Sequence, residues 1–253
     1  MLSLSFPFLV AILAFTSSAR DVPPNVRNFY NTVKGRGDCK LKLATGFSGS
    51  ASGSNTHSYC GDYANSTNIV YIKGPGQSFA NMDIDCDGEQ GGPNDGRCRG
   101  GDTKSATSFQ AIVRGYNKGI QDLNANIHPY VVFGNLGSQP GWRTFEPQKV
   151  DILPLSIVAV VCGNQLIYGI WGDINGDDDG YPVVGEASIS LATACYGNGM
   201  TSDAGHDEDD VLYIAFRGSS AVPGANGANW AARSYTEFEK SIEPLGNALV
   251  AMM

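Results

Sequence analysis

Short apolar runs separated by Gly, Pro, Asn and Asp make up most of the chain. These runs are rich in Val, Ile, Tyr and Phe, which favour β-strands over helices. The runs that predict strands are NIVYIK from 68, HPYVVFG from 128, PLSIVAVVCG from 154, QLIYGIWG from 165, EASISLATA from 186 and DVLYIAF from 210. Many short strands with turn residues between them are typical of barrels and sandwiches. The pattern therefore predicts a mainly β fold.

Helical spacing of apolar residues occurs in three segments, at 26–33, 108–117 and 236–250. Because these segments are few and flank the β-rich runs, we expect the helices to lie at the periphery of the sheet. The second segment has Thr107 or Ser108 available as an N-terminal cap, since both side chains can accept a hydrogen bond from a backbone N–H of the first turn.

The N-terminal residues have the pattern of a secretory signal peptide. An apolar stretch covers 2–15, small residues follow at 17–19, and the first charged side chain is Arg20. The stretch is too short to anchor the chain in a membrane, and the alternative is a buried N-terminal helix. We expect residues 1–19 to be removed and residues 20–253 to form one secreted catalytic domain, because chains of this size can fold as a single all-β unit.

Cysteine content agrees with an extracellular location. The chain has six cysteines, all after the predicted signal peptide, and an even number in an oxidising compartment favours disulfides. Cys86 and Cys98 bracket a glycine-rich loop and are the simplest pair to predict, while the other pairings stay open. The three histidines are widely scattered, so a zinc site has little support.

The net charge of −8 limits the kinds of partner. Nucleic acid is not expected as a partner, because binding phosphates needs a basic surface. A cationic partner fits the charge better, although many secreted proteins are acidic for solubility alone. No heptad pattern or large apolar stripe points to self-association, so we expect a monomer without a membrane segment.

The acidic run at 171–192, WGDINGDDDGYPVVGEASISLA, admits two interpretations. From Asn175 to Glu186 the spacing matches a calcium-binding loop. Such a loop needs helices on both sides, and the flanking segments look like strands instead. The flanks therefore favour a β-hairpin whose loop is 174–185, with Asp173 and Glu186 at the two strand ends.

Side-chain alternation predicts where these acids point. Glu186 falls on the polar face of its strand, and Asp173 shares a face with Trp171, which is either a platform for a sugar ring or part of the core. Two carboxylates across a sheet suit glycoside hydrolysis, in which one donates a proton and the other activates water. The residues alone leave this reading open against a structural acidic loop, with or without calcium.

A second acidic cluster, NMDIDCDG, contains Asp83, Asp85 and Asp87. It repeats the D-x-D-x-D-G pattern, but Asn94 stands where a calcium loop would need its bidentate glutamate. The simpler alternative is an Asp-rich turn held by Cys86.

Several segments together resemble the fungal endo-chitosanases of glycoside hydrolase family 75. They are NMDIDCDG (81–88), NIHPYVVFGN (126–135), PLSIVAVVCG (154–163), YGIWGDINGDD (168–178), VGEASISLATACYG (184–197) and GHDEDDVLYIAF (205–216). The resemblance implies that Asp173 and Glu186 are catalytic and that internal β-1,4 bonds of chitosan are cleaved with inversion. It also implies that no metal or other cofactor is needed.

The implied inverting mechanism requires the two carboxyl groups to stand about 6.5–9.5 Å apart. We expect Glu186 to be the general acid, since a glutamate has the higher ordinary pKa, and Asp173 to be the base. For the fold we favour a six-stranded double-psi β-barrel with peripheral helices, with a β-sandwich as the alternative.

The implied substrate is a polycation, so further acids are candidates for substrate contact. Asp83 and Asp85 are expected to bind ammonium groups, and Asn175, Asp177 and Trp171 are expected to line the site. The competing functions are a non-catalytic extracellular protein that binds calcium or carbohydrate, and a glycosidase that acts on neutral β-glucan.

Overall fold

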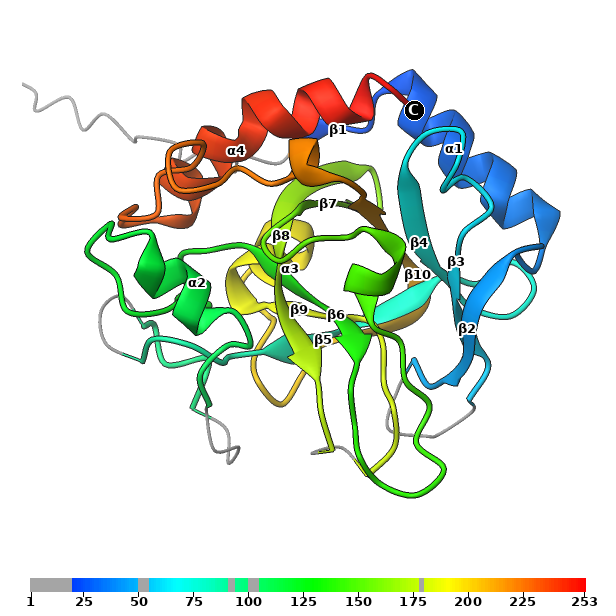
Figure 1. Cartoon of the computed structure of the whole chain (residues 1–253), viewed down its shortest axis with the longest axis horizontal. Helices are drawn as coiled ribbons and strands as arrows, with labels where there is room; N and C mark the ends of the chain where they lie inside the picture. Colours follow the sequence, from blue (N-terminus) through cyan, green and yellow to red (C-terminus); the bar gives the residue numbers. More distant parts are fainter. Residues whose placement is uncertain (1–19, 50–54, 91–93, 100–104, 178–179) are drawn as a thin grey trace, which may run out of the picture.

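The computed structural model describes residues 20–49, 55–90, 94–99, 105–177 and 180–253, drawn in colour in Figure 1. The predicted signal peptide at 1–19 lies outside the described residues. Among the described residues no helix combines the length and the apolar character that a membrane crossing requires.

The described chain is mainly β, as predicted, and its strands join one ten-stranded mixed sheet. The order along the sheet is β1-β8-β6-β9-β5-β10-β4-β3-β2, and β7 pairs with both β10 and β8. The strands are β1 Arg20–Asp21, β2 Lys42–Phe47, β3 His57–Cys60, β4 Ile69–Lys73, β5 Ala80–Asp85, β6 Tyr130–Asn135, β7 Ile157–Cys162, β8 Gln165–Asn175, β9 Glu186–Ser188 and β10 His206–Phe216.

The central pairings run from β7 through β8, β6, β9, β5 and β10, and then return to β7. Their lengths are uneven, because β9 has three residues and the ladder between β5 and β10 shifts its register. The expected closure into a double-psi barrel stays a prediction.

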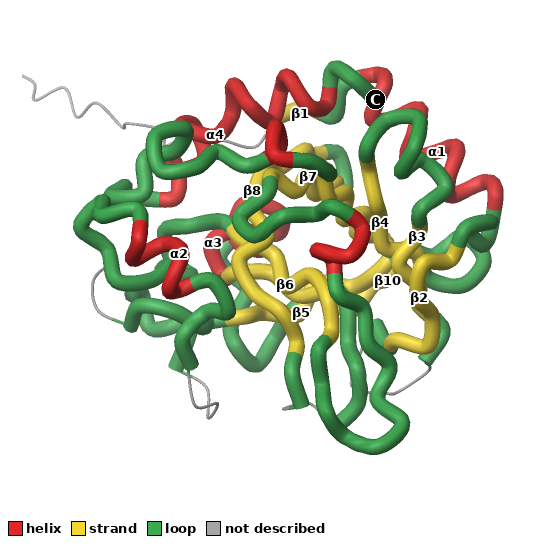
Figure 2. Tube along the Cα trace, in the orientation of Figure 1, coloured by secondary structure: helices red, strands yellow, loops and turns green. Residues whose placement is uncertain are grey.

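The helices lie around this sheet, which confirms their predicted peripheral position (Figures 1 and 2). Helices α1 and α4 run along one side of the molecule, and the short α2 lies beside the loops at one end. Their bounds are α1 Pro24–Arg36, α2 Gln110–Gly115, α3 Ile189–Tyr196 and α4 Tyr235–Val250, with the 3-10 helices η1 Pro147–Val150 and η2 Ser219–Ala221.

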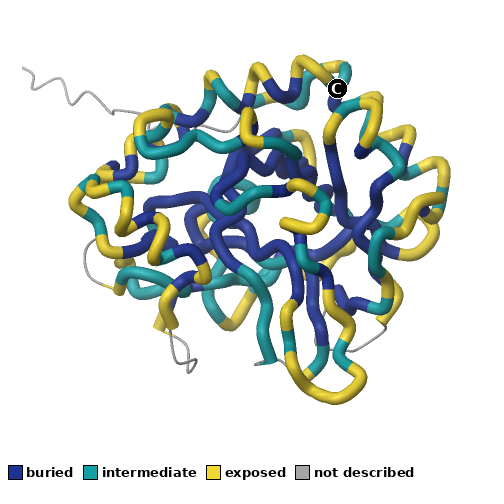
Figure 3. Tube along the Cα trace, in the orientation of Figure 1, coloured by how far each residue is buried: buried dark blue, intermediate teal, exposed yellow. Residues whose placement is uncertain are grey.

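The buried residues are concentrated in the central strands (Figure 3). All residues of β4, β6 and β7 are buried, and so are Val211–Phe216 of β10. Burying one large aliphatic or aromatic side chain contributes about 1.5–3 kcal/mol, so these strands form the most stable part of the fold. They provide the rigid support on which the polar residues near the sheet edge are held.

Two expectations for the segment after 185 were wrong. The predicted strand from 186 ends at Ser188, whose hydroxyl accepts a hydrogen bond from the Leu191 N–H and caps α3. The predicted hairpin between β8 and β9 does not form, because β6 lies between these two strands and pairs with both. This insertion separates the two acidic residues by a whole strand.

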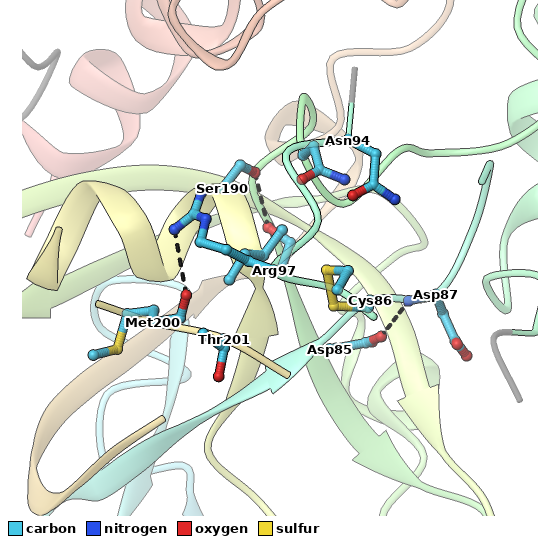
Figure 4. The surroundings of a disulfide bond; sticks show 12 residues. Asp85, Cys86, Asp87, Asn94, Arg97, Ser190, Met200 and Thr201 are labelled. Carbon is cyan, nitrogen blue, oxygen red and sulfur yellow. Dashed lines mark hydrogen bonds between the residues drawn. A yellow bond between two sulfur atoms is a disulfide. The ribbon is translucent and has the colours of Figure 1, made fainter. Parts of the chain in front are cut away.

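Disulfides tie the outer segments to the sheet. The predicted Cys86–Cys98 pair is present, and its position beside Asp85 and Asp87 is seen in Figure 4. The other two bridges are Cys39–Cys60 and Cys162–Cys195. The last of these fastens the end of α3 to the end of β7.

Candidate active site

Asp173 and Glu186 stand opposite the same residue of the sheet. Val132 of β6 pairs with Asp173 of β8 on one side and with Glu186 of β9 on the other. Residues that are paired in this way point to the same face of a sheet. The two carboxylates therefore share one face, two strand spacings apart.

A β-bulge directs Asp173 to this face. Val131 opposes Trp171 while Val132 opposes Asp173, so β8 has one extra residue, Gly172. A Cβ atom on Gly172 would lie 2.6 Å from Cβ of Tyr130, so only glycine fits. Because of the bulge, Asp173 and Trp171 point to opposite faces, and the prediction that they share one was wrong.

Hydrogen bonds hold the buried Asp173 carboxylate in place. Its Oδ1 accepts from the Ser108 hydroxyl at 2.5 Å, the Ser108 N–H at 3.0 Å and the Ile174 N–H at 2.8 Å. The indole N–H of Trp171 donates to the backbone carbonyl of Asp173 at 2.9 Å and fixes the bulge from the opposite face. These contacts restrict the side chain to one orientation.

Asp173 lies in a cluster with two other carboxylates. One oxygen of each of Asp85, Asp87 and Asp173 lies within 4.8 Å of the others. Burial raises the pKa of Asp173 to about 6, against the lowering effect of the hydrogen bonds from Ser108 and Ile174. Burial and then the neighbouring charges of Asp173 and Asp87 raise the pKa of Asp85 well above its ordinary value. Asp85 and Asp173 therefore retain their protons more strongly than carboxyl groups in water would.

Two hydrogen bonds and a disulfide keep this cluster compact. The Asp87 N–H donates to the Asp85 carboxylate at 2.7 Å, shown by a dashed line in Figure 4. The hydroxyl of Tyr130, which is buried, donates to the Asp87 backbone carbonyl at 3.1 Å. The Cys86–Cys98 disulfide closes the loop beside the cluster.

Glu186 has a more open environment. It is the first residue of β9 and is half-buried. The side-chain amide of Asn175 donates to its Oε2 at 2.5 Å. On the other side β5 brings Asp83 into register with Glu186. Asp173, Val132, Glu186 and Asp83 thus stand in one row across the sheet.

The calcium-loop interpretation from Asn175 to Glu186 does not match the described positions. Strands, not two helices, flank the segment. Asp177 accepts hydrogen bonds from the backbone N–H groups of Ser138 and Gln139, while Asn175 donates to Glu186. Within the described residues, the oxygens close enough to share a cation are those of Asp85, Asp87 and Asp173. The expected independence from metals stays a prediction.

The predicted substrate-contact residues have different surroundings. Trp171 is completely buried and packs edge to face against Phe109, so its predicted role as a sugar platform was wrong, because no face of the ring is exposed. Asp177 is half-buried and anchors the turn at Ser138. Asp83 lies beside Glu186, whereas Asp85 lies beside Asp173.

Ser108 and Tyr130 reach this site from distant parts of the chain and were not predicted to take part. Ser108 stood out in the sequence only as a possible helix cap, and Tyr130 only as part of an apolar strand. Neither sequence context signals a carboxylate neighbour 40 or more residues away. Such contacts depend on sheet topology, which local patterns do not encode.

Comparison with known proteins identifies the family. Residues 82–252 match the family described as fungal chitosanase of glycosyl hydrolase group 75. The chain is 44% identical over 246 residues to an endo-chitosanase of Aspergillus fumigatus, covering 96% of both chains. It is 42% identical over 254 residues to an endo-chitosanase of Aspergillus oryzae, covering 97% of this chain and 98% of the relative. With Asp173 and Glu186 inside the matched region, this chain belongs to the group 75 family of glycoside hydrolases.

Proposed function

We propose that this protein is a secreted endo-chitosanase that hydrolyses internal β-1,4 bonds between glucosamine units, with Asp173 and Glu186 as the catalytic carboxylates. The observation that carries the proposal is the pairing of both acids with Val132, which puts two carboxylates on one sheet face. The curated relatives that cover nearly the whole chain are endo-chitosanases, which supports the substrate.

An inverting mechanism suits the strand arrangement. Each step between neighbouring strands is about 4.8 Å, so the backbones of Asp173 and Glu186, two steps apart, are separated by at most roughly 10 Å. Inverting enzymes hold their carboxyl groups about 6.5–9.5 Å apart to leave room for water, whereas retaining enzymes hold them near 5 Å. One strand between the two acids leaves room for the wider spacing, and we propose inversion on this ground.

The environments of the two acids support the opposite roles from those expected from the sequence. Burial keeps the pKa of Asp173 near 6, so this side chain retains a proton in mildly acidic solution and is suited to be the general acid. Glu186 is half-buried and accepts a hydrogen bond from Asn175, which favours a carboxylate base. We therefore assign Asp173 as acid and Glu186 as base.

In the proposed reaction Asp173 gives its proton to the glycosidic oxygen as the bond to C1 breaks. Glu186 takes a proton from water, and the water oxygen attacks C1 from the opposite side of the ring. The products are a shortened chain with a new hydroxyl group and a reducing end of inverted configuration. One proton has passed from Asp173 to the leaving oxygen and one from water to Glu186, so exchange with solvent restores the enzyme.

The acidic residues near the pair support a cationic substrate. Asp83 lies in register with Glu186 and is half-buried, and the whole chain has a net charge of −8. We propose that Asp83 binds a substrate ammonium group and that Asp85 mainly helps Asp173 to keep its proton. A neutral β-glucan would have no use for an ammonium-binding acid.

We propose that Trp142, in place of Trp171, provides the aromatic platform for a sugar ring. Of the three tryptophans, Trp171 and Trp230 are buried and Trp142 is half-buried. Trp142 lies in the loop after β6, which leaves the sheet at the same edge as the loop after β8 (Figure 1). The backbone N–H of Trp142 donates to the Gln139 carbonyl, and Asp177 accepts a hydrogen bond from the Gln139 backbone N–H, so the two loops are joined at this point.

Secretion is also part of the proposal. Three disulfides among the described residues are typical of an oxidising compartment, and residues 1–19 have the composition of a signal peptide, and both support secretion. We further propose that residues 20–253 form one catalytic domain and act as a monomer without a cofactor.

The first test compares Asp173→Asn and Glu186→Gln with the wild type. Because each variant removes one proton-transfer group, we expect each to lower kcat on deacetylated chitosan on the order of 10²–10⁴-fold. Reducing-end release measures the loss, and NMR of the initial product gives its anomeric configuration. Asp151→Asn, at an exposed position outside the site, is the control and should keep full activity. Activity retained by either variant, or activity on carboxymethyl cellulose equal to that on chitosan, would contradict the proposal.

The raised pKa of Asp173 predicts a pH-dependent difference in stability. With a folded pKa near 6 and an ordinary value of 3.8, its stabilising contribution is complete below pH 3.8 and is lost as pH rises through 6. Asp173→Asn cannot ionise, so its unfolding free energy should gain up to about 3 kcal/mol relative to wild type between pH 4 and pH 7.5. Urea unfolding at both pH values measures this gain. A difference that does not change with pH would show that Asp173 is ionised in both states.

Asp83→Asn tests the ammonium-binding role. We expect KM for chitosan to rise several-fold at low salt and the effect to shrink at high salt, because salt screens the lost charge interaction. Asp85→Asn is the matched variant on the same strand, and it should change the pH profile of kcat/KM more than it changes KM. An unchanged KM for Asp83→Asn at low salt would remove this residue from the substrate site.

We expect Trp142→Ala to weaken substrate binding and Trp171→Ala to destabilise the fold. Trp142→Ala is expected to raise KM with little change in melting temperature, and Trp142→Phe should restore most of the binding because it keeps an aromatic face. Trp171→Ala should destabilise the protein by about 3–5 kcal/mol, since it empties a buried site. Equal KM values for Trp142→Ala and wild type would rule out the platform.

A further inference from the structure

The turn before α2 connects two aspartates through neighbouring hydroxyl groups. The sequence predicts Thr107 or Ser108 as the cap of this helix, but the N-cap is Phe109, without a side-chain hydrogen bond. The two hydroxyls donate hydrogen bonds to aspartates instead. Thr107 donates to Asp122 at 2.5 Å, and Ser108 donates to Asp173 at 2.5 Å.

Asp122 anchors this turn from inside the protein. The residue is 2% exposed, and its carboxylate accepts hydrogen bonds from four donors. Two of these are the N–H and hydroxyl of Thr107, one is the Gln110 amide, and one is the Leu123 N–H. With a carboxylate so well satisfied, the position of Thr107 is fixed, and the next residue along the chain is fixed with it.

Ser108 therefore contacts Asp173 through both its backbone N–H and its side-chain hydroxyl. Its N–H and its hydroxyl both donate to Oδ1, at 3.0 and 2.5 Å, and the Ile174 N–H adds a third bond to the same oxygen at 2.8 Å. An oxygen that already accepts three donors is a poor place for a proton. A proton on this carboxyl group is consequently directed to Oδ2.

We propose that Ser108 is a positioning residue for Asp173, which holds the carboxyl group in one orientation and directs its proton to Oδ2, with Thr107 and Asp122 as the anchor of the turn. The inference rests on the proposed function, in which Asp173 is the proton donor. It adds that the donor atom is Oδ2 and that a segment 65 residues earlier in the chain selects it.

The effect of Ser108 on the proton of Asp173 is opposite to that of the other groups that face Asp173. Asp85 and Asp87 approach from β5 and the segment after it, Tyr130 approaches from β6, and Glu186 stands across Val132 on β9. The carboxylates among these favour a protonated Asp173, whereas the two Ser108 donors favour the ionised form. Removing the hydroxyl should therefore make the proton harder to release.

The test compares Ser108→Ala with Ser108→Thr, which keeps a hydroxyl. Ser108 is exposed, so both variants should fold, and melting temperatures check this. We expect Ser108→Ala to lower kcat on chitosan about tenfold or more with KM changed less than about twofold, because orientation of a catalytic group affects the chemical step. The basic limb of its kcat/KM profile should move to higher pH. Ser108→Thr should restore both.

Thr107→Val provides a second variant, because it removes the hydroxyl that binds Asp122 without touching Asp173. It should produce a smaller effect in the same direction. If kcat and both pH limbs of Ser108→Ala equal those of wild type, the inference is overturned. If the acidic limb moves instead, Ser108 still positions Asp173, and the acid and base assignments are reversed.

A readout without substrate separates this inference from the proposed function. Carbon-13 NMR of the labelled Asp173 carboxyl group follows its titration in wild type and in Ser108→Ala. A higher pKa in the variant supports the contact even if the wild type does not hydrolyse chitosan, in which case only the proposed function fails. Identical titration curves would overturn the role of Ser108 whatever the activity.

Discussion

The pairing of β6 with β8 on one edge and with β9 on the other is the constraint on which the site depends. It puts Val132 between Asp173 and Glu186 and gives both acids the same face of the sheet. Backbone hydrogen bonds between the strands hold this spacing. All residues of β6, and of β7 on the other side of β8, are buried, which makes this part of the sheet rigid. A hairpin would have brought the two acids onto adjacent strands, about 4.8 Å apart, which is closer to the geometry of a retaining enzyme. One intervening strand thus separates two possible stereochemical outcomes.

The bulge at Gly172 is the second feature on which the site depends. Without an extra residue, strict alternation along β8 would leave Trp171 and Asp173 on one face, and either the tryptophan would be exposed or the aspartate would face the core. The bulge lets the indole pack against Phe109 while the carboxylate turns to the opposite face. Tyr130 and Leu123 crowd Gly172 so closely that a side chain at this position would displace one of them. The close packing of the core therefore also maintains the direction of the Asp173 carboxylate, the proposed proton donor.

The sequence predicted the strands that consist of long Val- and Ile-rich runs, because such runs leave little choice of structure. It did not predict β2, β3 and β5, in which polar and small residues interrupt the pattern. The segment after Glu186 was predicted as a strand, since ISLATACY fits either period, and the helix there depends on the Ser188 cap and the Cys162–Cys195 bridge. The proposed catalytic pair came from family resemblance, whereas Ser108 and Asp122 could not be found, because only the folded sheet brings the Ser108 turn to Asp173.

In the proposed mechanism the substrate itself creates an electrostatic difficulty that the site has to overcome. Chitosan brings ammonium groups, and a positive charge close to a carboxylic acid lowers its pKa and promotes early loss of the proton. Burial of Asp173 and the neighbouring carboxylates of Asp85 and Asp87 act in the opposite direction. Asp83 lies in register with Glu186 and outside the cluster of Asp85, Asp87 and Asp173, so we expect an ammonium group to bind beside Glu186. An acidic protein that degrades a polycation therefore needs two kinds of carboxylate, ionised ones that attract the substrate and a secluded one that resists its charge.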